Sequence, residues 1–113
     1  MANPLKGQVE LELAGQIYKA RLTIEAIMSI ENALGSSLLK LASKMSDGDV
    51  GVTEIVNILH PGLRGGGNDL SMQQVMQIVD DAGIVASTVA ISNLLGQTLN
   101  PKGTEGSSKK QED

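Results

Sequence analysis

The chain has 113 residues, of which 41% are hydrophobic, and its formal net charge is −4. It contains no Cys, Phe or Trp, which excludes disulfides and cysteine-ligated metal centres and requires an aliphatic core. The acidic balance and the single aromatic residue, Tyr18, argue against nucleic acid as a partner. No stretch approaches the roughly 20 apolar residues of a membrane span, so we expect a cytoplasmic protein without a membrane partner.

The first element that the sequence predicts is a β-hairpin over residues 7–22. Apolar and polar side chains alternate strictly in residues 7–13, the period-two pattern of a half-buried strand. After an Ala14-Gly15 turn, residues 16–22 alternate again, so that basic side chains face acidic ones across the pair. A two-stranded ribbon is marginal alone, and it must therefore pack on helices or pair with a neighbour.

Apolar side chains at helical spacing predict three short helices before residue 61. Thr23 is a suitable N-cap for the first helix and Gly35 a suitable stop, because a hydroxyl accepts early N–H groups and glycine adopts the left-handed conformation. Ser36 or Ser37 caps the second helix, and the third starts near Thr53. The apolar positions are Ile24, Ile27, Met28, Ile30 and Leu34, then Leu38, Leu39, Leu41, Ala42 and Met45, then Ile55, Val56, Ile58 and Leu59.

Residues 59–74 predict a helix end, a flexible hinge and a new helix start. Proline lacks a backbone donor and glycine costs roughly 1 kcal/mol against alanine, so Pro61 and the glycines of residues 62–67 should break the third helix. Ser71, with Gln74 three residues later, forms a capping box for the next helix. Leu70 should contact Val75 across this helix start.

Two further helices are predicted, over residues 72–82 and 84–99, separated by Gly83. The last helix is the most apolar, which predicts a central helix or an interface. Residues 100–113 carry no large apolar side chain and predict a disordered tail. The expected fold class is α+β, mainly α: one domain over residues 1–99, with the hairpin at 7–22 and a bundle of about five short helices at 24–99.

The glycine run around Arg64 could be taken for a phosphate cradle. However, no strand precedes it and no Gly-Lys-Ser/Thr follows it, so a hinge or a partner-contact loop is the better interpretation. A lone arginine between glycines can bind a carboxylate, either that of Asp69 or one on another subunit.

The remaining polar motifs do not predict catalysis, a metal site or a cofactor. Asp47-Gly48-Asp49 begins like a calcium loop but lacks the later Gly and Glu, so it predicts a turn. His60 has no partner ligand at a suitable spacing and is expected to face the C-terminal dipole of its helix. Asp80 and Asp81 are adjacent and would point about 100° apart on a helix, unlike a general acid and base. We therefore expect a protein that is not an enzyme.

Five short segments carry a resemblance to a known family. They are Asn3-Pro4-Leu5-Lys6-Gly7, Arg21-Leu22-Thr23, Glu31-Asn32-Ala33-Leu34-Gly35, the stretch GLRGGGNDLS at 62–71, and Ala82-Gly83. In this order, over residues 3 to about 99, the chain resembles the tail proteins of gene transfer agents and related siphophages. These are grouped with phage tail assembly chaperones and are sometimes labelled tail tube proteins. Gly-Leu-Arg-Gly-Gly-Gly is the most distinctive part.

The resemblance implies a tail assembly chaperone that binds the tape measure protein and recruits tail tube subunits in the host cytoplasm. Small helical modules of this kind bind partner helices through apolar grooves and are expected to form homo-oligomers. From the pattern alone, we expect the partner-binding residues to be Arg64, Met72, Met76, Leu94, Leu95 and Leu99. One alternative is a structural tail (tube) component retained in the particle, although two predicted strands are few for a tube subunit. Another is a small cytoplasmic helical adaptor.

Overall fold

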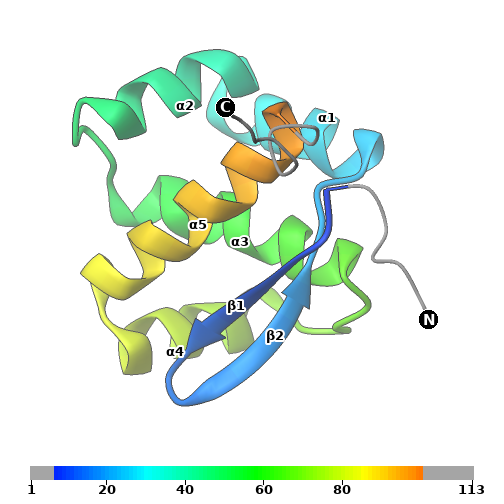
Figure 1. Cartoon of the computed structure of the whole chain (residues 1–113), viewed down its shortest axis with the longest axis vertical. Coiled ribbons are helices and arrows are strands. Elements are labelled where there is room, and N and C mark those ends of the chain that lie inside the picture. Colours follow the sequence, from blue (N-terminus) through cyan, green and yellow to red (C-terminus); the bar gives the residue numbers. More distant parts are fainter. Residues whose placement is uncertain (1–6, 101–113) are drawn as a thin grey trace, which may run out of the picture.

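The computed structural model describes residues 7–100, and within this range a β-hairpin is followed by five helices (Figure 1). The predicted fold class, α+β and mainly α, is confirmed. The predicted tail at 100–113 lies outside the described residues, apart from Asn100. The elements are β1 (Val9–Leu13), β2 (Gln16–Ala20), α1 (Ile24–Leu34), α2 (Leu38–Ser46), α3 (Val52–Gly65), α4 (Met72–Ala82) and α5 (Ile84–Leu99).

The hairpin forms with the predicted turn and the predicted faces. Ala14 and Gly15 have φ values of 53° and 80°, and two positive φ values in a two-residue turn match the natural twist of a hairpin. Glu10 lies opposite Lys19 in the antiparallel register, as the charge pattern predicts. The inner face packs on the helices, with β1 against α5 and α4, and β2 against α3. The buried inner residues are Leu11, Leu13 and Ala20.

Local capping residues set the helix starts. The Thr23 Oγ1 atom accepts the N–H of Ala26 at 3.0 Å, and Gly35 ends α1 with a φ of 63°. Ser37, rather than Ser36, caps α2. The predicted capping box is present, because the Ser71 hydroxyl accepts the Gln74 N–H at 3.1 Å and the Gln74 side chain accepts the Ser71 N–H at 2.8 Å. These starts need no tertiary contact, which is why the sequence predicts them well.

The predicted helix break at residue 61 is wrong, because α3 continues through Pro61 and Gly62 to Gly65. A proline inside a helix costs about 3 kcal/mol. This cost is offset by burial of Leu59 and Leu63, which are both 0% exposed and contribute roughly 1.5–3 kcal/mol each. The Gly62 carbonyl also accepts two N–H groups, from Arg21 at 2.9 Å and from Gly66 at 3.2 Å. Tertiary packing therefore overrides the local preference.

The glycines of this stretch are packing positions and not a flexible hinge. A Cβ atom on Gly65 would lie 2.0 Å from the Arg21 carbonyl oxygen, and one on Gly66 would lie 2.0 Å from that of Lys19. Just beyond them, the Asn68 amide donates to the Lys19 carbonyl at 2.6 Å. The end of α3 is thus held directly against the backbone at the end of β2. We call this contact the α3–β2 junction.

The core lies between the hairpin and the helices, with α3 and α5 at its centre (Figure 1). The apolar stripes predicted for α1 and α2 are wider than the faces that the structure buries. Ile24, Met28 and Leu39 are 74%, 59% and 70% exposed, because each short helix turns only one narrow face inward. One buried polar atom, the Ser87 Oγ, has no hydrogen-bond partner among the described residues.

Helix α5 is central over one half of its length and exposed over the other, and an interface role for it stays a prediction. Its C-terminal half is central, since Ile91, Leu94 and Leu95 are buried. Its N-terminal half is apolar and exposed, with Ile84, Val85 and Val89 at 53%, 79% and 56%. Among the described residues, no single helix is long and apolar enough to cross a membrane, and α4 and α5 meet that length and hydropathy only as a pair bent by 117°.

An ion pair between Lys44 and Glu54 joins α2 to the start of α3. The hydrogen bond from Lys44 lowers the pKa of Glu54, and the Gly51 N–H, which donates to the same carboxylate at 2.8 Å, lowers it further. The hydrogen bond to Glu54 raises the pKa of Lys44. Both shifts favour the folded chain at neutral pH, where both groups are charged.

The α3–β2 junction predicts that Gly65→Ala lowers the free energy of unfolding by about 3 kcal/mol, because the added methyl group meets backbone that cannot move aside. Urea denaturation followed by circular dichroism measures the effect. Gly96→Ala in α5 is the matched control: a Cβ there meets nothing within 4 Å, so the substitution should stabilise the helix by about 0.5–1 kcal/mol. If Gly65→Ala and Gly96→Ala changed the free energy of unfolding equally, the close backbone contact at the α3–β2 junction would be contradicted.

The pH dependence of stability should change in Glu54→Gln. A lowered pKa contributes stability that is present above the ordinary carboxyl range and is lost as the pH falls through the folded-state pKa. The variant should therefore be less stable than the parent at neutral pH, and this difference should vanish in acid. Thermal unfolding across pH measures it, with Glu12→Gln as the control, since Glu12 lies opposite Ile17 and not opposite a cation.

Candidate functional site

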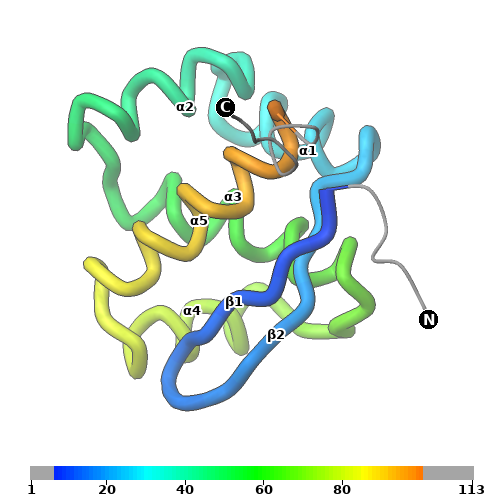
Figure 2. The backbone as a smooth tube through the Cα atoms, in the orientation of Figure 1, coloured from blue at the N-terminus to red at the C-terminus, as the bar shows by residue number. Residues whose placement is uncertain are grey.

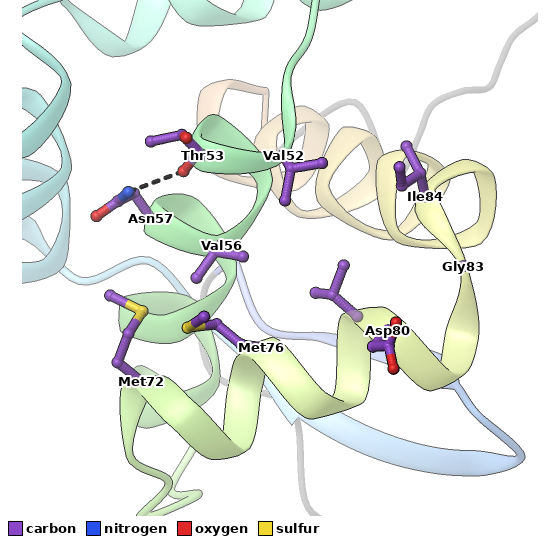
Figure 3. A pocket seen from close by; sticks show the side chains of 10 residues that line it. Val52, Thr53, Val56, Asn57, Met72, Met76, Asp80, Gly83 and Ile84 are labelled. Atoms are coloured by element: carbon purple, nitrogen blue, oxygen red, sulfur yellow. Dashed lines mark hydrogen bonds between the residues drawn. The ribbon is translucent and has the colours of Figure 1, made fainter.

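An open apolar groove of ≈ 510 Å³ lies between the start of α3, the length of α4 and the start of α5 (Figure 3). Two methionines from α4 stand on one side, and short aliphatic side chains from α3 and α5 complete it. We call it the methionine groove. It is lined by Val52, Thr53, Val56, Asn57, Met72, Met76, Val79, Asp80, Gly83 and Ile84.

The groove owes its shape to two local features of the sequence. The capping box at Ser71 fixes where α4 begins, and therefore which α4 side chains face α3. Gly83, with a φ of 94°, then makes the 117° corner between α4 and α5, which is visible at the lower left of Figure 2. A Cβ on Gly83 would meet nothing within 4 Å, so it is the backbone conformation and not a lack of space that requires glycine here.

The groove has a buried floor and exposed rims. Val56 and Val79 are 7% and 4% exposed and form the floor, whereas Val52, Met76 and Ile84 are about half exposed, at 48%, 52% and 53%. The unbranched, polarisable side chain of methionine adapts its shape to an irregular partner. This arrangement suits the apolar side chains of a docked helix.

Polar groups in the groove are few. The Asn57 side-chain amide donates to the Thr53 carbonyl at 2.8 Å, the dashed line in Figure 3, and is thus engaged within its own helix. Asp80 is the single charged residue of the lining. A carboxylate on the wall of an apolar groove can pair with a cation of a bound partner.

Of the six residues that the sequence pattern suggests for partner binding, the structure brings two together in the methionine groove and two others in a smaller cleft. Met72 and Met76 line the methionine groove. Leu94 and Leu95 are 0% and 3% exposed in the core, and Leu95 also lines a smaller cleft together with Leu99. Leu99 is 39% exposed, and this cleft of ≈ 220 Å³ lies between α2 and α5. Partner contact by any of them stays a prediction.

Arg64, the sixth residue, lies away from the methionine groove, at the C-terminal end of α3. Its Nη1 atom is 3.7 Å from the Asp69 Oδ1 atom, which is the within-chain partner suggested by the sequence. The two side chains are 56% and 97% exposed, and a pair so open to solvent contributes little to stability. An intersubunit role for Arg64 stays a prediction.

The other polar motifs serve the fold. Asp47-Gly48-Asp49 forms the predicted turn, with Gly48 at a φ of 75°. His60 does not lie at the helix end as expected, because α3 continues to Gly65; instead its Nε2 atom lies 2.9 Å from the Leu70 carbonyl oxygen and ties down the connection to α4. Within residues 7–100, no three His, Asp or Glu side chains gather as a metal site would require. The absence of a metal or cofactor remains a prediction.

Sequence reasoning missed Val52, Ile84 and Asp80 as members of one site. The sequence pattern shows Ile84 only as the start of the last helix, Asp80 only as a residue that does not converge with Asp81, and Val52 only as the residue before the expected start of the third helix near Thr53. The signal that could have joined them is Gly83. A glycine between two amphipathic helices, with a fixed start at Ser71, predicts a corner whose inner side faces the preceding helix.

The comparison with known families gives one match. A family model described as "Phage tail tube protein, GTA-gp10" matches residues 6–101, a range that spans the hairpin, all of the described helices and the whole methionine groove. No curated protein and no solved structure matches the chain.

The exposed groove predicts binding of an uncharged apolar dye such as Nile red. Met76→Lys should reduce dye fluorescence while changing the free energy of unfolding by no more than about 0.5 kcal/mol, because Met76 is half exposed. Leu39→Lys on α2 is the matched control: its side chain is 70% exposed but does not line the groove, and dye binding should be unchanged. An equal loss of fluorescence in both variants would contradict the site.

Proposed function

The chain belongs to the phage tail tube protein, GTA-gp10, family, and on this premise we propose that it acts as a tail assembly chaperone. In this role it binds the tape measure protein during tail morphogenesis and recruits tail tube subunits. Membership of this family shows that the chain is a tail-associated protein of a phage or gene transfer agent. The chaperone role is more specific than family membership, and the observation that supports it is the open methionine groove.

The groove supports binding of an extended helical partner for a physical reason. A long tape-measure helix exposes apolar faces that would aggregate in water before a tube encloses them. Many small modules, each covering a short segment of such a helix, would shield these faces. Met72 and Met76, one helical turn apart on α4, provide adaptable contacts for segments that differ in sequence.

Recruitment of tube subunits requires a second surface, and α5 offers one. Val85 and Val89 are 79% and 56% exposed, lie one helical turn apart, and do not line the methionine groove. We propose this pair as the contact with a tail tube subunit or with another copy of the chain. The proposal places the work of the protein in the host cytoplasm and assigns it no catalytic activity.

A structural tail component that stays in the particle is the second candidate, and the family description itself favours it by naming a tail tube protein. Against it, the sheet of residues 7–100 has two strands, which is little material for the continuous wall of a tube. The two functions differ in the fate of the protein. A chaperone leaves when the tube forms, whereas a tube subunit remains.

The chaperone role predicts co-purification with a co-expressed tape measure protein. Met76→Lys should reduce the captured protein severalfold, and Leu39→Lys should leave it unchanged. Leu95→Asp is not a useful probe, because Leu95 is buried and the change would unfold the domain. If Met76→Lys and Leu39→Lys both capture as much of the partner as the parent protein does, the methionine groove takes no part in the interaction.

Mass spectrometry of purified particles separates the two candidates. A chaperone should be absent, or present far below one copy per tube subunit. Stoichiometric amounts in the finished tail would overturn the chaperone proposal and favour the structural one.

A further inference from the structure

Asp80 is the one charged residue that lines the methionine groove, and the Lys44–Glu54 pair at the start of α3 is not part of the lining. Residues 65–100 contain Asp69, Asp80 and Asp81 and no Lys or Arg. Asp69 pairs with Arg64, and Asp81 accepts a hydrogen bond from the Gln77 side chain at 3.0 Å. Asp80, on the groove wall, forms neither kind of contact with any side chain in the described part of the chain.

We propose that the occupant of the methionine groove is an amphipathic helix that carries a Lys or Arg beside its apolar face, and that this cation pairs with Asp80. This inference rests on the proposed function, since it specifies the partner of the same site. Lys and Arg side chains suit the position, because their apolar stems can lie along Met76 and Ile84 while the charged end reaches the carboxylate. Asp80 thereby selects among apolar helices and fixes their register.

A second copy of the chain fits this groove poorly. Copies related by a twofold axis through α4 and α5 would bring acidic residues together, with no Lys or Arg on either helix. The exposed Lys40 on α2 lies next to the exposed Leu39, but the other leucines of that helix, Leu38 and Leu41, are buried in the core. One available leucine does not fill a groove of ≈ 510 Å³.

Two synthetic helical peptides test the charge preference. Both carry leucines at helical spacing; one has lysines flanking the apolar face, and the other has glutamates at the same positions. Fluorescence anisotropy should show that the parent protein binds the lysine peptide more tightly, and that Asp80→Asn weakens this binding roughly two- to fivefold. The effect should shrink at high salt, because the pair is close to solvent.

Asp81→Asn is the matched control, since it removes the same charge one residue away, on another face of α4. Its binding of the lysine peptide should equal that of the parent. Equal weakening in both variants would mean that net charge alone attracts the peptide and would overturn the inference. Equal affinity for the two peptides would also overturn it.

The outcomes also separate this inference from the proposed function. If the parent protein captures the tape measure product and Asp80→Asn captures it equally well at low salt, the charge preference fails and the chaperone role stands. If the lysine peptide binds through Asp80 but no tape measure product is captured, the chaperone role fails and the preference stands. A concentration-dependent dimer that Met76→Lys abolishes would assign the groove to a second copy and overturn the inference.

Discussion

The contact on which this fold depends is the α3–β2 junction, where the backbone of a helix end lies against the backbone of a strand end. A single Cβ atom on Gly65 or Gly66 would come within 2.0 Å of a carbonyl oxygen of the facing strand. Gly62, one turn earlier, lets α5 pack closely on α3, since a Cβ atom on Gly62 would lie 2.5 Å from the side chain of Leu94. The one glycine-rich segment therefore positions both the hairpin and the central helix.

The sequence predicts what is local and fails where distant contacts decide. The caps at Thr23 and Ser71 and the hairpin turn depend only on neighbouring residues, so they can be predicted without knowledge of the fold. The run of Pro61 and nearby glycines indicates a break by the same local rules, yet α3 passes through it. Burial of Leu59 and Leu63 and the hydrogen bond from Arg21 come from tertiary structure, which periodicity alone does not reveal.

In the candidate site, too, the sequence does not show which apolar residues the fold buries. An apolar stripe looks identical whether it faces the core or a partner, and so Leu95 and Met76 are equivalent in the sequence and opposite in the structure, at 3% and 52% exposure. What distinguishes them is the corner at Gly83, which turns the exposed start of α5 toward α3. The family match, over residues 6–101, adds the biological setting of a tail, which neither periodicity nor geometry supplies.

The α3–β2 junction also constrains the order in which a growing chain can mature on the ribosome. The hydrogen bond from Asn68 to Lys19 joins residues 49 positions apart, and the Arg21 N–H donates to the Gly62 carbonyl across a similarly long stretch of sequence. The buried side chains of β1, Leu11 and Leu13, lie on the strand that packs against α4 and α5, so they stay uncovered until these two helices have also left the exit tunnel. The chain therefore passes through a nascent stage in which these apolar side chains are uncovered.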